Sequence, residues 1–203
     1  MKSLLLATQN PGKTKEMKAL LGVLPLNLIM PQELDLQIAI SEDGSTYAEN
    51  AAHKALAYAQ ASTLPTIADD SGLEVEALDG SPGIHSARFA PWSEATDADR
   101  RCYLLEQLQP YPRPWKARFR CTVALATPRG EIYFTEGICT GEIIPTERGT
   151  HGFGYDPIFY LPQQGLTMAE LPTGVKNTLS HRARAVQAAI PIIKKVLDLP
   201  EGK

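Results

Sequence analysis

The stretch LLLATQNPGK at residues 4–13 decides the fold class. Its first four residues form an apolar run that is typical of a short buried strand. A helix is expected to begin near Lys13, because apolar residues recur at helical spacing from Met17 to Leu21 and Gly22 follows as a stop. A buried strand that passes through a polar loop into a helix is the first half of a β–α unit and predicts an α/β fold.

The rest of the chain continues this alternation and then departs from it. Two further short strands are expected at residues 26–30 and 66–68, and helices at 46–62, at 97–109 and from about Ser180. Residues 117–125 alternate apolar and polar side chains, and a turn at 127–130 leads into a second strand at 132–138. Because β–α units are mixed with an antiparallel hairpin, the sheet is expected to be mixed rather than parallel throughout.

Composition bounds the possible functions. With 203 residues, 43% of them hydrophobic and 21% charged, the chain suits a single globular α/β domain, with or without a smaller lobe. A net charge of -3 provides no broad basic face, so a nucleic-acid partner is not expected. No apolar run is long enough to cross a membrane or to serve as a signal peptide, and the three cysteines lack metal-site or disulfide spacing. We therefore expect a cytoplasmic protein.

The polar loop after the first strand is a candidate phosphate site. A helix start presents backbone amides and the positive end of the helix dipole, and Lys13 adds a charge. The residues concerned are Thr8, Gln9, Asn10, Pro11, Gly12 and Lys13. The P-loop motif is excluded, because its first glycine would fall on Ala7. An ordinary turn with a solvated lysine remains the alternative.

Two adjacent acids, Asp69 and Asp70, follow the apolar residues 66–68 and precede Ser71. Side chains of adjacent strand residues point to opposite faces, but a turn at a strand end would let both acids approach one cleft. Magnesium prefers hard oxygen ligands, and a further carboxylate could deprotonate an attacking water. The segment offers no cationic neighbour in sequence, so a bound cation would explain the pair. A turn that caps the strand is the alternative.

Two other segments have weaker signals. Glu42 is a candidate second metal ligand, but a turn at residues 43–44 and a capping box at Glu49 explain this segment, which by itself does not assign Glu42 to a metal. The aromatic side chains of Phe153 and Tyr155 alternate with glycines and could stack on a nucleobase, which is worth roughly 1–3 kcal/mol per base. The alternative is that both aromatic residues belong to the core.

Taken together, these segments resemble the Ham1 family, the inosine/xanthosine triphosphate pyrophosphatases. The resemblance runs from Thr8 to Arg184 with the motifs in the family's order. Its most specific parts are Asn50-Ala51, Ala68-Asp69-Asp70-Ser71-Gly72-Leu73, Pro82-Gly83-Ile84-His85-Ser86-Ala87-Arg88, Gly152-Phe153-Gly154-Tyr155-Asp156-Pro157, and Lys176 with Ser180-His181-Arg182.

The resemblance implies an elongated mixed sheet that carries two lobes around a central cleft, within one domain spanning residues 1–203, and a homodimer. It implies that a Mg²⁺-activated water attacks the α-phosphate of ITP, dITP or XTP and releases pyrophosphate. Asp70 would be the general base and a metal-linked acid, with Glu42 and Asp69 assisting at the metal. The triphosphate would lie on residues 8–13. The remaining nucleotide-binding residues would be Ser71, Phe153, Gly154, Tyr155, Asp156 and Lys176, with His181 and Arg182 reading the base.

Some alternatives stay open at this level. A related pyrophosphatase for pyrimidine or standard nucleotides would use the same reaction, although the aromatic loop with His181 and Arg182 favours oxidised purines. A nucleotide sensor without turnover would leave Asp69 and Asp70 unexplained. The sequence does not rank ITP, dITP and XTP, and coupled acids can share the metal and proton roles.

Overall fold

The computed structural model describes residues 1–41 and 43–200. Within it the chain forms two compact units. The first consists of Met1–Asp70, Cys121–Gly137 and His181–Lys203, and the second of Ser71–Arg120 and Ile138–Ser180. Within the described ranges, no helix combines the length and the apolar character needed to cross a membrane.

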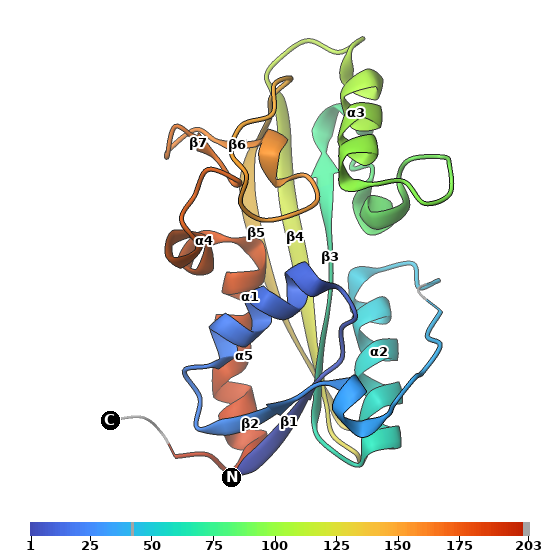
Figure 1. Ribbon diagram of the computed structural model, residues 1–203, viewed down its shortest axis with the longest axis vertical. Helices are drawn as coiled ribbons and strands as arrows, with labels where there is room; N and C mark the ends of the chain where they lie inside the picture. Colours follow the sequence, from blue (N-terminus) through green and yellow to red (C-terminus); the bar gives the residue numbers. More distant parts are fainter. Residues whose placement is uncertain (42, 201–203) are drawn as a thin grey trace. The chain divides into compact units, whose positions relative to one another are not determined.

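The strands form one mixed sheet in the order β2-β1-β3-β4-β5-β6-β7 (Figure 1). β1 pairs in parallel with β2 and β3, whereas β6 pairs antiparallel with β5 and β7. The tight turn at residues 127–131 joins the neighbours β4 and β5 as a hairpin. The predicted mixed sheet is confirmed. The strands are β1 Lys2–Leu6, β2 Leu26–Ile29, β3 Thr66–Val75, β4 Trp115–Ala126, β5 Ile132–Ile143, β6 Phe159–Leu161 and β7 Leu166–Thr167.

The predicted helices are present, with small shifts at their ends. The first begins at Pro11, because the Asn10 side chain accepts a hydrogen bond from the Lys13 N–H and caps it there. Thr46 caps the second helix in the same way. The short helix before the last one was not predicted, since its seven residues carry too little periodicity. The helices are α1 Pro11–Leu21, α2 Tyr47–Ser62, α3 Asp97–Leu108, α4 Thr173–Leu179 and α5 His181–Leu197.

In the first unit, helices cover both faces of the sheet, and strand alternation assigns each side chain to a layer (Figure 1). Leu4 and Leu6 of β1 pack in a cluster with α1 and α5. Leu5 and Ala7 point the other way and pack against the alanine-rich face of α2. The small side chains of α2 allow that helix to approach the sheet closely. The layering extends to β3, where Ile67 belongs to the α1 and α5 side and Ala68 to the α2 side.

The second unit has its own core. Leu73 and Val75 of β3 pack with the apolar side of α3, from which Leu104 and Leu108 are buried. Short 3₁₀ segments complete this unit: η2 Glu76–Leu78, η3 Gly83–Arg88 and η4 Asp156–Ile158. The first unit contains one as well, η1 Pro31–Leu34.

The strand through the acidic pair is longer than the sequence predicted. β3 does not end at Ala68 but runs from Thr66 to Val75, so Asp69 and Asp70 lie inside it. The expectation of a turn at this point was wrong. The apolar residues Leu73 and Val75 resume the burial pattern of the strand, and they extend it past the acids into the second core.

We predict that Gly137→Ala destabilises the first unit. A Cβ at this position of β5 would lie 2.1 Å from the His181 carbonyl oxygen and 2.5 Å from the Ala185 nitrogen, both backbone atoms of α5. Overpacking of this kind typically costs about 1–3 kcal/mol. Urea denaturation measures the loss. Gly174→Ala is the matched control, because its Cβ would meet no atom within 4 Å; equal stability of the two variants would contradict the close approach of α5.

Candidate active site

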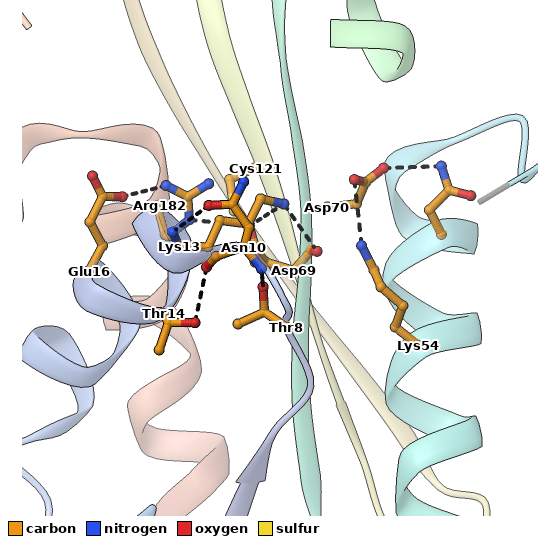
Figure 2. A network of polar contacts seen from close by, with 11 residues as sticks. Thr8, Asn10, Lys13, Thr14, Glu16, Lys54, Asp69, Asp70, Cys121 and Arg182 are labelled. Carbon is orange, nitrogen blue, oxygen red and sulfur yellow. Dashed lines mark hydrogen bonds and ion pairs between the residues drawn. The ribbon is translucent and has the colours of Figure 1, made fainter. Parts of the chain in front are cut away.

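The adjacent acids of β3 point to opposite faces of the sheet (Figure 2). Residues two apart in a strand share a face, so Asp69 lies with Ile67 on the side of α1 and α5. Asp70 lies with Ala68 on the side of α2. Because the strand does not turn between them, each carboxylate has a separate set of partners. The two acids therefore have separate environments, and their chemistry must be judged one at a time.

Asp69 lies in a fully buried cationic environment. Its Oδ2 lies 3.1 Å from Lys13 Nζ and 3.2 Å from Arg182 Nε. The Cys121 thiol also approaches Oδ2, at 3.7 Å. Burial alone would raise the pKa of Asp69, but the charges of Lys13 and Arg182 outweigh it and hold that pKa well below its usual range. Asp69 is thus ionised throughout the neutral range, which makes it a poor proton acceptor there.

Arg182 is the largest fully buried side chain of the described residues, with 1% of its surface exposed. Its guanidinium pairs with Asp69 through Nε and with Glu16 of α1 through a second nitrogen. Burial alone would lower the pKa of Arg182, but the charges of Asp69 and Glu16 outweigh burial and raise that pKa above its usual range. Glu16, Arg182, Asp69 and Lys13 therefore form a chain of alternating charges that links α1, α5 and β3 (Figure 2).

Asp70 has a different environment. Its Oδ2 accepts a hydrogen bond from the Asn50 side chain at 3.1 Å, and its Oδ1 lies 3.7 Å from Lys54 Nζ. Burial raises the pKa of Asp70, and the charge of Lys54 offsets only part of that effect. A buried carboxylate with a raised pKa, held by one amide and one distant ammonium, is suited to accept a proton.

Asn50 and Lys54 were not singled out as site residues from the sequence. They are four positions apart on α2 and so lie on the same face of that helix, toward Asp70. This i, i+4 pair of an amide and a cation on an otherwise alanine-rich face was the available signal. Glu16 was missed for a simpler reason, since a single acid in an amphipathic helix carries no recognisable pattern.

The predicted phosphate loop starts α1 as expected, but several of its groups are already engaged. The Lys13 N–H donates to Asn10 Oδ1 at 3.0 Å, and the Asn10 N–H donates to Thr8 Oγ1 at 3.3 Å. Gln9, Asn10 and Pro11 are exposed. Lys13 Nζ, beside Asp69, also approaches the Asp69 carbonyl oxygen at 3.5 Å. The loop therefore presents an accessible helix start whose lysine is positioned by Asp69.

This loop begins level with Asp69, at the point where β1 ends and β3 continues. β1 and β3 are parallel neighbours, with Leu6 opposite Ile67, and the Ala7 N–H donates to the Ile67 carbonyl oxygen at 2.8 Å. The first loop residue therefore follows its strand at the level of the acidic pair. Ligands of open α/β sheets bind beyond the carboxyl ends of parallel strands, which is where this loop begins.

The other predicted binding residues lie in the second unit. Asp156 and Lys176 are a buried pair, with Lys176 Nζ 2.5 Å from Asp156 Oδ2 and 5.4 Å from the centre of the Phe153 ring. Tyr155 is a core residue with 4% of its surface exposed, and its hydroxyl donates to the Ser86 carbonyl oxygen at 2.9 Å. Phe153 is only half-buried, so it is the more accessible of the two aromatic residues in this loop.

The structure thus divides the predicted site residues into two groups. The first unit contains Thr8, Gln9, Asn10, Pro11, Gly12, Lys13, Asp69, Asp70, His181 and Arg182, and the second contains Ser71, Phe153, Gly154, Tyr155, Asp156 and Lys176. Their roles in binding and catalysis stay predictions. Glu42 lies outside the described residues, so its predicted place at a metal has no structural counterpart here.

The donor chemistry at Asp70 fits a magnesium ion. Residues 1–41 and 43–200 contain no group of three potential His, Cys, Asp or Glu ligands, but Mg²⁺ needs only one or two carboxylates when phosphate oxygens and water complete its shell. Asp70 provides a hard oxygen whose negative charge is incompletely offset by Lys54 at 3.7 Å. Asp69 is less suited, because its Oδ2 already binds Lys13 and Arg182.

Comparisons with known proteins agree with one another. A family model described as the Ham1 family matches residues 4–192. A protein of Geobacter sulfurreducens named dITP/XTP pyrophosphatase is 45% identical over 187 residues, which cover 92% of this chain and 94% of that protein. One of the same name from Thermus thermophilus is 44% identical over 190 residues, covering 93% and 90%.

Solved structures of Ham1 proteins are also similar to this chain. A HAM1 protein from Coxiella burnetii superposes with a TM-score of 0.87 at 39% identity, covering 96% of this chain and 100% of its own. The Staphylococcus aureus Ham1 protein superposes with a TM-score of 0.84 at 37% identity, with the same coverage of both chains.

We predict that Asp69→Asn destabilises the protein at neutral pH by roughly 3–5 kcal/mol, because it leaves the Arg182 charge buried with one partner fewer. The depressed pKa of Asp69 means that its contribution is present above the pKa of an unfolded aspartate, about 4, and is lost as the pH falls through the folded value.

Urea denaturation between pH 7 and pH 3 measures both effects. Wild type should lose stability toward pH 3 more steeply than Asp69→Asn, in which this acid-sensitive component is absent. Asp35→Asn, at an exposed acid of the same unit, should follow wild type. An Asp69→Asn variant as stable as wild type at pH 7 would contradict the role of the buried pair.

Proposed function

The chain belongs to the Ham1 family, and we propose that it hydrolyses deaminated purine nucleoside triphosphates, such as dITP, ITP and XTP, to the monophosphate and pyrophosphate. Relatives that bear the name dITP/XTP pyrophosphatase match more than nine-tenths of the chain. The activity removes deaminated purines from the nucleotide pool.

One observation carries the proposal. Asp70 is a buried carboxylate with a raised pKa, and it lies within β3 at the level where the neighbouring strand β1 ends and leads into the phosphate loop. We infer that a proton acceptor and a phosphate-binding helix start lie at the same level of one sheet. Hydrolysis of a phosphoanhydride needs these two functions, one to activate water and one to hold the charged chain.

In the proposed mechanism, Asp70 accepts the proton of the water that attacks the α-phosphate. Asn50 and Lys54 hold the Asp70 carboxylate in place, since they contact different oxygens of it. Lys13 and the start of α1 bind the triphosphate, and Gly12 keeps the backbone free of a side chain there. Pyrophosphate then leaves as the bond between the α- and β-phosphates breaks.

Asp69 and Arg182 act indirectly in this proposal. Arg182 fixes Asp69, and Asp69 fixes the ammonium of Lys13 beside the helix start. The burial of Arg182 favours such a positioning role over direct contact with the base. His181, at the first position of α5, remains our proposed reader of the base, together with Ser71, Lys176 and the loop from Phe153 to Asp156.

We propose Mg²⁺ as the cofactor, held by Asp70 and Glu42. When bound, it supplies positive charge that offsets the charge of the triphosphate. We further propose that the protein acts in the cytoplasm as a homodimer. The cytoplasm is supported by cysteines that form no disulfide, and the homodimer by the family resemblance.

Selection against adenine has a simple physical basis. Inosine and xanthine carry a 6-oxo acceptor where adenine carries a 6-amino donor. A site that offers donors at this position would leave the adenine amine unpaired, and buried polar mismatches of this kind can discriminate strongly.

Product analysis tests the proposed reaction. With Mg²⁺, the purified protein should release pyrophosphate from ITP, dITP and XTP, and much less from ATP, GTP or UTP at the same concentration. Equal release from the standard nucleotides would keep the reaction and overturn the proposed substrate class. Orthophosphate as the product, or binding without turnover, would overturn the reaction itself.

Asp70→Asn should lower kcat/KM for ITP by about 10²–10⁴-fold, the usual contribution of a general base. Circular dichroism and urea denaturation provide the folding control. A folded Asp70→Asn protein with near-normal turnover would exclude Asp70 as the base.

A further inference from the structure

The start of α3 holds both backbone groups of one residue in the proposed nucleotide loop. The Gly154 N–H donates to Asp97 Oδ2 at 2.7 Å, and the Gly154 carbonyl oxygen accepts from an Arg101 guanidinium nitrogen at 2.8 Å. Asp97 and Arg101 are four residues apart on the same face of the helix. Each contact joins residues more than fifty positions apart in the sequence, so both contacts depend on the tertiary structure.

Arg101 is itself anchored. Its Nε and one terminal nitrogen donate to the two carboxylate oxygens of Glu147, at 2.8 and 2.9 Å. This bidentate geometry orients the planar guanidinium, and its remaining terminal nitrogen bonds Gly154. The arginine side chain is 12% exposed and that of Glu147 is 43% exposed, so only the arginine end of the pair is shielded from water.

Asp97 is held in its charged form. Burial alone would raise its pKa, but the hydrogen bond from the Gly154 N–H and the neighbouring Arg100 hold that pKa below its usual range. A charged acceptor makes the stronger hydrogen bond to an amide. The contact with Gly154 is therefore matched to the ionised state of Asp97 at neutral pH.

A residue of the loop itself, Asp156, holds the backbone at Phe153. Asp156 Oδ2 accepts from the Phe153 N–H at 2.9 Å and pairs with Lys176 Nζ at 2.5 Å. Gly152 makes this possible, because a Cβ there would lie 2.0 Å from Asp156 Oδ2. Phe153 thus lies between two fixed points, its own N–H on Asp156 and the next residue on α3.

The backbone here needs such support. Gly152 and Gly154 have φ values of 80° and 62°, and glycine loses more conformational freedom on ordering than any other residue. A loop that must be ordered on binding reduces affinity by that entropic cost, whereas a loop already ordered does not.

We propose that Asp97 and Arg101 are positioning residues, which clamp Gly154 and so hold Phe153 ready to pack on the base of the nucleotide. The inference rests on the proposed function, because it assumes that this loop contacts the base. The proposal assigns α3 a role in substrate affinity. In this proposal neither Asp97 nor Arg101 touches the substrate or the reacting atoms. A preordered loop contributes equally to ground state and transition state, so it should affect KM and leave kcat nearly unchanged.

The test compares Arg101→Met and Asp97→Ala with wild type in two binding measurements. IMP carries the base, whereas pyrophosphate does not. Both variants should weaken IMP binding by about tenfold, equivalent to ~1.4 kcal/mol, and leave pyrophosphate binding in Mg²⁺ within about twofold. The KM for ITP should rise similarly at nearly constant kcat. Asp97→Asn should restore most of the affinity, because its amide oxygen still accepts from Gly154.

Hydrogen exchange of the segment 152–156 provides a readout that does not depend on activity. The Gly154 amide should exchange faster in Arg101→Met and Asp97→Ala than in wild type. Arg118→Met is the matched control, since it removes an arginine pair with Glu74 at 2.5 Å elsewhere in the same unit; its exchange and IMP affinity should match wild type.

Unchanged exchange in both variants would overturn the clamp. Faster exchange with unchanged IMP affinity would show that the loop is clamped but does not serve the base, which overturns the positioning role. Failure of the proposed function is seen elsewhere, in a wild-type protein that releases no pyrophosphate from ITP.

Discussion

The buried ion pair between Asp69 and Arg182 is the constraint on which the first unit depends. It joins the middle of β3 to the first turn of α5, and Glu16 and Lys13 extend it to α1. Two carboxylates balance two cations in this network of four side chains, so each of the four charges has an opposite charge beside it. Such a network is costly to assemble and still more costly to interrupt. Its consequence is that the start of α1, where phosphate would bind, is held at a defined place above the sheet.

The two-residue period of a strand then separates two acids that are neighbours in sequence. Asp69 faces the cationic layer and stays ionised, whereas Asp70 faces α2 and has a raised pKa. One side chain serves structure and the other is available for chemistry, although their covalent surroundings are almost the same. The difference is produced by their partners: two close cations in one case, and an amide with a distant lysine in the other.

A similar division of labour occurs in the aromatic loop of the second unit. Tyr155 enters the core and fixes the loop through Ser86, while Phe153 stays half-buried under Lys176. The loop is held at Gly154 from α3 and at Phe153 from Asp156. Rigid support on both sides of one half-buried aromatic residue is what a binding surface of low ordering cost requires.

The sequence by itself determined the fold class, most of the helices and the family, because these depend on local periodicity, caps and the order of motifs. It placed Thr8 to Lys13 at a helix start, where the Asn10 cap confirms it. It did not reveal that β3 continues beyond the acidic pair, because polar residues interrupt the apolar pattern there. The partners of Asp69 and Asp70 were decided only by the tertiary structure. Arg182 is more than a hundred residues from Asp69, and no local pattern records which distant charge meets a buried acid.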